Sequence, residues 1–186
     1  VNSTAFLKNE DGKGPKVMGN PTEGALLLWL HDQQKDFAAL RDAAPVTEQL
    51  TFSTERKYMA TVVRSAQLPG KRILYIKGAP EIVHSLCQNT IGNVTREEID
   101  RQLLAYQNQA MRTLGFAYQI LEDSDATLTD TKAIAERLTF LGIVAIADPV
   151  RSDVPAAVGD CLSAGINIKI VTGDTPGTAR AIGRQD

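Results

Sequence analysis

The stretch MATVVRSAQLPGKRILYIKGAPE, residues 59–81, decides how the first part of the chain folds. Its β-rich runs Met59–Arg64 and Arg72–Lys77 are separated by a Leu-Pro-Gly segment, an arrangement that predicts a β-hairpin. The second run ends in a lysine, and Pro80 after it suits the first position of a helix. The stretch therefore predicts two antiparallel strands that deliver a solvent-reachable Lys77 to the start of a short helix.

Helix start signals stand on both sides of this hairpin. Asn20 can cap a helix whose first position is Pro21, and the helical pattern continues to about Asp42. Thr95 and Glu98 have the spacing of a capping box, which predicts a helix that runs to about residue 114. The other predicted elements are a loop or weak edge hairpin over 1–18, a short helix over 80–88, a strand over 116–121, an acidic loop over 122–130 and a short helix around 131–137. Because strands and helices do not alternate regularly here, we expect a mostly antiparallel sheet with flanking helices.

The last fifty residues or so have a different pattern. The apolar runs Leu138–Ala147 and Ile166–Val171 are typical of buried strands, and Val154–Ala164 between them is helical in pattern, with Gly165 as its stop. The order strand, helix, strand predicts a parallel βαβ unit. The fold class that we expect is therefore α+β, with one domain over 1–147 and an incomplete parallel unit over 148–186.

Composition excludes several classes of protein. With 43% hydrophobic residues and a net charge of -2, the chain is neither disordered nor a generally basic nucleic-acid binder. Its longest apolar runs fall far short of the roughly 20 residues that cross a bilayer, and its two cysteines lack metal-site spacing. Because of the cysteine spacing, we expect no metal site. The chain begins at Val1 without a basic-then-apolar leader, so we expect a piece of a longer protein with no signal peptide.

Candidate ligand-binding residues follow a cationic stretch. From Phe52 to Lys77 there are six cations and one acid, an excess that could attract a small anion. A ring at Phe52 could stack on a purine while Lys57 meets phosphate, and Gly78 could let a ligand approach the backbone beside Lys77. Each feature has a plain structural explanation as well: a core ring, a solvated strand face, or a strand-to-helix turn.

Three further motifs are open to two interpretations. The carboxylate of Glu23 could accept a hydrogen bond from an exocyclic amine, or could serve only in the first turn of its helix. Arg112 could meet an anion, or could only favour the end of a helix. Thr172-Gly173-Asp174 closes the second apolar run, where a hydroxyl and a carboxylate could address a phosphoryl group and its Mg²⁺, or could cap the next helix.

Five motifs occur in one order along the chain: Gly19–Leu26, Phe52–Met59, Lys77–Glu81, Asp148–Arg151 and Thr172–Asp174. This series resembles the cytoplasmic catalytic region of the P-type ATPases, the cation-pumping family. The resemblance extends from about Gly19 to the end of the chain. The motif Gly-Asn-Pro-Thr-Glu at residues 19–23 and the pattern Phe-x-x-x-Arg-Lys-x-Met are most similar to the calcium-pump branch.

The resemblance implies a nucleotide-binding domain that is inserted into a haloacid-dehalogenase-like phosphorylation domain. Its implied residue roles are these: Glu23 at the adenine edge with Thr22 nearby, Phe52 stacked on adenine, Lys57 and Lys77 lining the pocket, Gly78 allowing close approach, Arg112 on the phosphates, Leu114 against the ligand, Asp148 and Arg151 at the hinge, and Thr172, Gly173 and Asp174 at the phosphorylation site.

The resemblance also implies ATP as the ligand and Mg²⁺ as a cofactor of the complete enzyme. The implied partners are the phosphorylation, actuator and transmembrane domains of the same pump, with this part on the cytoplasmic side of the plasma membrane. The family's Asp-Lys-Thr-Gly-Thr segment, which carries the phosphorylated aspartate, is not in this chain. We therefore expect ATP binding without turnover, and a segment 148–186 that is either mobile or buried by self-association.

Two other functions fit parts of the sequence. A free-standing haloacid-dehalogenase-like phosphatase would use Asp123 and Asp125, with Thr172 as its second motif. Against it, Glu122 would disfavour an ionised Asp123, and only twelve residues follow Asp174. A non-catalytic interaction module would bind no nucleotide at all.

Overall fold

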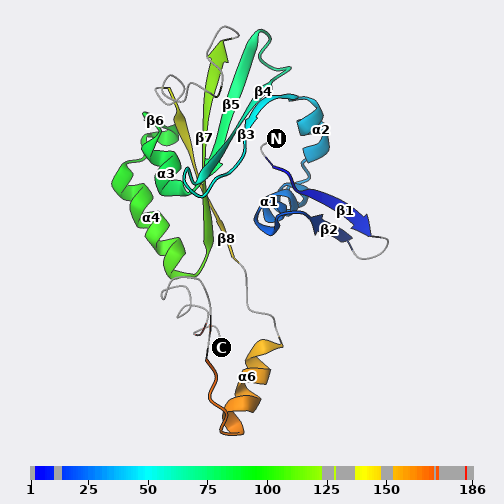
Figure 1. The fold of residues 1–186 in the computed structure, drawn as a ribbon, viewed down its shortest axis with the longest axis vertical. Helices are drawn as coiled ribbons and strands as arrows, with labels where there is room; N and C mark the ends of the chain where they lie inside the picture. Colours follow the sequence, from blue (N-terminus) through cyan, green and yellow to red (C-terminus); the bar gives the residue numbers. More distant parts are fainter. Residues whose placement is uncertain are drawn as a thin grey trace. The chain divides into compact units, whose positions relative to one another are not determined.

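The computed structural model describes residues 3–10, 14–122, 128, 137–147, 153–169, 171 and 183. Figure 1 shows the described helices and strands of the chain, which divides into two compact units. The first combines Val1–Asn93 with Leu114–Gly142, and the second combines Val94–Thr113 with Ile143–Asp186. Glu23, Phe52 and Lys77 belong to the first unit.

A six-stranded sheet is the main element of the structure. Its strands are β3 (Val46–Leu50), β4 (Tyr58–Arg64), β5 (Lys71–Gly78), β6 (Asn89–Thr90), β7 (Arg112–Glu122) and β8 (Thr139–Ile146). They lie in the order β3-β4-β5-β7-β8-β6. The pairs β3–β4, β4–β5 and β5–β7 are antiparallel, while β6 and β8 form a short parallel pair. The α+β class and the mostly antiparallel sheet expected from the sequence are confirmed.

The predicted hairpin forms the centre of the core. In β4 and β5, the side chains of Val62, Val63 and Leu74 are at most 1% exposed, because apolar residues occupy both faces of these strands. Helix α3 (Pro80–Ser85) follows β5 directly and buries Val83. The ring of His84 meets the ring of Phe140 in β8 edge-on, with 4.9 Å between the ring centroids. The two chain segments of the first unit therefore contribute to one core.

A second, two-stranded sheet leads into helix α1 (Pro21–Asp32). Strands β1 (Phe6–Glu10) and β2 (Gly14–Met18) pair antiparallel, as the predicted edge hairpin. The Asn20 side chain accepts hydrogen bonds from the backbone N–H groups of Thr22 and Glu23, so this residue caps α1 as expected. The hairpin packs so closely on α1 that a Cβ at Gly24 would overlap the Val17 side chain.

Two helix boundaries differ from those predicted. The single helix expected from Pro21 to Asp42 is two helices, α1 and α2 (Phe37–Asp42), because Gln34 takes a positive φ of 56° and Asp36 caps a new start. The helix expected to run to about residue 114 is α4 (Arg96–Asn108), which ends before Ala110 at φ 59°. The position given to Arg112, at a helix end, is therefore wrong: this residue opens β7.

Strand β3 was not predicted from the sequence. Its residues Val46–Leu50 are mostly polar and exposed, so they have no run of apolar residues. Pairing with β4, with a register shift between Val46 and Glu48, makes this segment an edge strand of the sheet.

In the second unit, the predicted cap of α4 is present. Thr95 Oγ1 accepts from the Glu98 N–H at 3.3 Å, and Glu98 Oε2 accepts from the Thr95 N–H at 2.9 Å, which completes the capping box. Helix α6 (Val154–Ser163) is also present, and Gly165 follows it at φ 76°, as the predicted stop.

The predicted parallel βαβ unit is not seen in the described residues. Residues 166–169 and 171 form no strand, and β8 belongs instead to the six-stranded sheet, with β6 as its parallel partner. Asp148–Arg151, Thr172–Asp174, Asp123 and Asp125 lie outside the described residues, as do residues 131–136 of the short helix predicted there. Within the described part of the chain, no helix is both long and apolar enough to cross a membrane.

Candidate functional site

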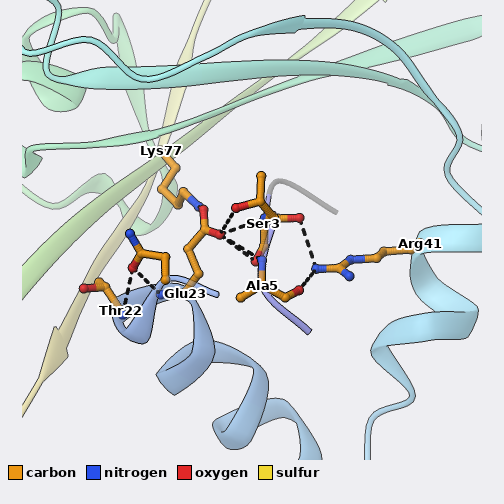
Figure 2. Close-up of polar contacts among 8 residues, drawn as sticks. Ser3, Ala5, Thr22, Glu23, Arg41 and Lys77 are labelled. Atoms are coloured by element: carbon orange, nitrogen blue, oxygen red, sulfur yellow. Dashed lines mark hydrogen bonds and ion pairs between the residues drawn. The ribbon is translucent and has the colours of Figure 1, made fainter. Parts of the chain in front are cut away.

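A buried ion pair joins the start of α1 to the end of β5. Lys77 Nζ donates to Glu23 Oε1 at 2.6 Å, and the two side chains are only 6% and 10% exposed (Figure 2). The Asn20 cap sets Glu23 in the first turn of α1, where a carboxylate also suits the helix dipole. The expectation that Lys77 is solvent-reachable is wrong, because the fold brings an acid 54 residues away in sequence onto it.

The second oxygen of Glu23 holds the start of the chain. Oε2 accepts from the N–H groups of Thr4 and Ala5 at 2.7 and 3.1 Å, and from the hydroxyls of Thr4 and Ser3 at 2.8 and 3.2 Å (Figure 2). Burial alone would raise the pKa of Glu23, but the hydrogen bonds from Lys77 and Thr4 outweigh it and lower the pKa to about 2. Glu23 is therefore a carboxylate at every physiological pH.

Helix α2 reaches the same segment from its other side. Arg41 Nη2 donates to the backbone carbonyls of Ser3 and Ala5 at 3.1 and 2.7 Å (Figure 2). The guanidinium also lies 5.6 Å from the centroid of the Phe37 ring, one turn back on α2. Sequence analysis missed Ser3, Thr4 and Arg41, because nothing local distinguishes them from ordinary loop and helix-surface residues.

Gly78 is required by the fold itself. A Cβ at this position would overlap the Lys57 carbonyl and Tyr58, because β4 and β5 come together here in the register Tyr58↔Gly78. The Lys57 backbone is in the left-handed region at φ 59°, and its carbonyl accepts from the Ala79 N–H at 2.9 Å. The close approach at Gly78 thus has a structural cause, which is independent of any ligand.

Phe52 lies in the loop between β3 and β4, and its side chain is 58% exposed. The loop is ordered by its own bonds: Arg56 N–H donates to Ser53 Oγ at 3.2 Å, and Arg56 Nη2 donates to the Thr51 carbonyl at 2.7 Å. The interpretation of Phe52 as a core residue is therefore wrong. An exposed ring on a tied loop is suited to stacking against a flat ligand.

Lys77 shares one face of the sheet with aromatic side chains. The strand register sets Phe116 opposite Lys77 and Tyr118 opposite Tyr75, and residues paired in this way lie on one face. Burial raises the pKa of Tyr75, and the neighbouring Tyr118 adds to this. The two aromatic residues at the alternate positions 116 and 118 of a predicted strand were the available signal for this face.

The family model described as "P-type ATPase, cytoplasmic domain N" matches residues 1–153. The chain belongs to this family. As an N domain it is similar to plasma membrane calcium-transporting ATPase 4 of Homo sapiens, at 34% identity over 93% of this chain.

Fungal and plant proteins to which the chain is similar are also calcium-transporting ATPases by name. The chain is 33% identical to calcium-transporting ATPase 2 of Cryptococcus neoformans over 100% of its length. It is also 33% identical to calcium-transporting ATPase 10, plasma membrane-type, of Oryza sativa over 95% of its length. The chain spans only 15% of the human and fungal proteins and 18% of the rice protein.

The structure brings some of the N domain's predicted site residues together. Glu23 and Lys77 are in contact, and Thr22 precedes Glu23 in the cap. Gly78 follows Lys77, and the Lys57 backbone lies against Gly78 where β4 and β5 meet. Leu114, half-buried, belongs to the first unit, while the exposed Arg112 belongs to the second. Their roles toward a ligand, like that of Phe52, stay predictions.

The described residues hold neither a cluster suited to a metal ion nor a thiolate at Cys87. Among them, no group of three or more His, Cys, Asp or Glu side chains could hold a metal ion. Burial raises the pKa of the Cys87 thiol to about 12, so this cysteine is not a thiolate nucleophile.

Proposed function

We propose that this N domain binds ATP and presents it to a phosphorylatable aspartate outside this chain, as part of an ATP-driven calcium pump. The observation that carries the proposal is the exposed ring of Phe52, on an ordered loop in the same unit as Lys57 and Lys77. A ring of this kind can stack on adenine, while ammonium groups can meet the phosphates. The names of the calcium-transporting relatives support the nature of the pump.

Within this proposal, the N domain contributes binding and orientation. Phe52 holds the base, with Thr22 and Glu23 at its edge. Lys57 and Lys77 line the pocket, and Arg112 addresses the phosphates. Phosphoryl transfer depends mainly on positioning and on charge stabilisation. We assign Thr172, Gly173 and Asp174 to the phosphorylation site, and Asp148 and Arg151 to the hinge that leads to it.

Mg²⁺ serves the complete enzyme, where it would stabilise charge on the transferred phosphoryl group. The described residues do not fit a Mg²⁺ site, because no cluster of three acidic, histidine or cysteine side chains occurs among them. We therefore expect ATP to bind this chain without a requirement for Mg²⁺.

The setting of the domain follows from its relatives. We propose that residues 1–147 are the nucleotide-binding domain and that 148–186 are the hinge and part of the phosphorylation domain, a division that the family match over 1–153 supports. The partners are then the phosphorylation, actuator and transmembrane domains of the same pump. The plasma membrane pumps among the relatives support a position on the cytoplasmic side of that membrane.

The first test is an ATP titration followed by chemical-shift changes. Stacking of a base on an aromatic ring is worth about 1–3 kcal/mol, so Phe52→Ala should weaken ATP binding roughly 5- to 150-fold. Trp29→Ala is the matched control, because Trp29 is an equally exposed aromatic residue of the same unit, at 60%. Equal affinities in wild type and Phe52→Ala would remove Phe52 from the site, and an absence of binding to the wild-type chain would contradict the proposed function.

A further inference from the structure

The segment Ser3–Ala5, here termed the clamp, lies between two helices and contacts both. On one side, Glu23 of α1 accepts its N–H and O–H groups; on the other, Arg41 of α2 binds its carbonyls (Figure 2). Ala5 is fully buried, and a Cβ at Gly19 would lie only 3.2 Å from its Cα. The clamp is thus anchored by one buried residue and by polar contacts on both sides, although it precedes the first strand.

The clamp determines which way the Glu23 carboxylate faces. A carboxylate oxygen has about two lone-pair directions, and Oε2 already accepts four donors of the clamp within 3.2 Å. That oxygen has no capacity left for another donor. Oε1 is consequently the oxygen that remains for Lys77, which it meets at 2.6 Å.

Arg41 controls the direction of the clamp's donors through the geometry of the peptide bond. In a trans peptide unit, the carbonyl of Ser3 and the N–H of Thr4 lie in one plane and point in opposite directions. Arg41 holds that carbonyl at 3.1 Å, and Glu23 accepts that N–H at 2.7 Å. Rotation of this peptide would break both bonds together, so the arginine fixes the donor that the carboxylate receives.

We propose that Arg41 is a positioning residue for the Glu23–Lys77 pair, acting through the clamp to fix these two side chains within the pocket proposed for an anionic ligand. This inference rests on the proposed function, since the anionic ligand is the ATP inferred above. Arg41 itself touches neither Lys77 nor, in this proposal, the nucleotide. Its ring contact with Phe37 keeps the guanidinium in place for both carbonyls.

The test compares Arg41→Met, which keeps the stem but removes the donors, with Arg41→Lys, which keeps a charged donor. Arg101→Met is the matched control, because Arg101 is an exposed arginine of α4. Two quantities are measured on the full chain: ATP affinity by chemical-shift titration, and the pKa of the Glu23 carboxyl by carbon-13 NMR. A purely structural arginine would leave both unchanged in the folded protein.

Arg41→Met should weaken ATP binding about five- to twentyfold, in line with loosening hydrogen bonds to a charged group. The pKa of Glu23 should rise from about 2 toward its ordinary value, because the clamp donors are no longer held on Oε2. Arg41→Lys should recover part of both effects, and Arg101→Met should match wild type.

An unchanged Glu23 pKa in folded Arg41→Met would overturn the inference, as would a lower melting temperature with unaltered ATP affinity. If Arg41→Met does not fold, Thr4→Val replaces it, since this change removes a single hydroxyl donor to Oε2 from an exposed residue. A Glu23 pKa that does not rise in Thr4→Val is also contrary to the inference. Failure of wild type to bind ATP would end the proposed function alone, because the pKa comparison still tests the clamp.

Discussion

Glu23 joins three parts of the first unit by polar contacts. Its two oxygens join the start of the chain, α1 and β5, and both charges of the ion pair are nearly buried. A buried pair of this kind adds little stability by itself, but removing one partner leaves an uncompensated charge and costs about 3–5 kcal/mol. Replacement of Lys77 should therefore destabilise the fold as well as weaken ligand binding.

The ionisation of Glu23 makes the free energy of unfolding of the protein depend on pH. Because its pKa in the folded state, about 2, lies below the ordinary 4.5, the unfolded chain takes up the proton first as pH falls. The contribution of the Glu23 carboxylate to the free energy of unfolding is fully present above about pH 4.5 and is lost progressively toward pH 2. Its upper limit is roughly 3 kcal/mol.

Glu23→Gln should accordingly be less stable than wild type at neutral pH, and the difference should shrink as pH falls through this window. Urea unfolding at a series of pH values measures it, with Glu55→Gln, an exposed glutamate of the same unit, as the control. A constant difference between Glu23→Gln and wild type over the whole series would refute the role given to this carboxylate.

At the scale of elements, the ends of β4, β5 and β7 converge where two glycines face each other. The register pairs Tyr58 with Gly78 and Gly78 with Gly115. A Cβ at Gly115 would lie 2.7 Å from Pro80 Cα, so the start of α3 packs directly on β7. Lys77 owes its place beside Glu23 to this convergence, because it is the residue immediately before Gly78.

Gly78→Ala should therefore destabilise the first unit, by roughly 3 kcal/mol, since its Cβ would overlap backbone atoms that cannot move independently. Gly159→Ala is the control: this glycine lies within α6, and a Cβ there would meet open space, so an alanine should be neutral or slightly stabilising. Chemical denaturation of both variants measures the contrast, and equal stability of Gly78→Ala and wild type would show that the strands can separate here.

At the scale of the whole molecule, the second unit presents apolar side chains to solvent. Leu162, Ile166, Ile168 and Val171 are between 43% and 96% exposed. Exposed apolar side chains are typical of a binding surface where they form one contiguous patch. The expectation that the segment 148–186 is mobile or takes part in self-association stays a prediction.

Removal of the residues after 147 should leave ATP binding within about twofold, because the first unit contains the residues proposed to bind it, apart from Arg112, which is also retained. The shortened chain should sediment as a monomer over the concentration range in which the full chain associates. A full chain that is strictly monomeric, with residues 153–169 strongly protected from hydrogen exchange, would contradict this expectation.

The sequence by itself determined the features that depend on near neighbours. The Asn20 cap, the Thr95–Glu98 capping box and the hairpin of β4 and β5 follow from residues a few positions apart, whose bonds form in any context that allows the element. The order of short motifs also indicated the family, which the match over residues 1–153 confirmed.

Only the tertiary structure decided which distant residues meet. Edge strand β3 exists because β4 offers it a partner, and β7 begins at Arg112 because α4 ends at Asn108. Lys77 is buried because Glu23, 54 residues away, reaches it, and the clamp lies on Glu23 because Arg41, 36 residues from Ala5, holds it there. Such contacts have no local signal: their free energy comes from burial and from satisfying polar groups across the fold, which a linear pattern does not contain.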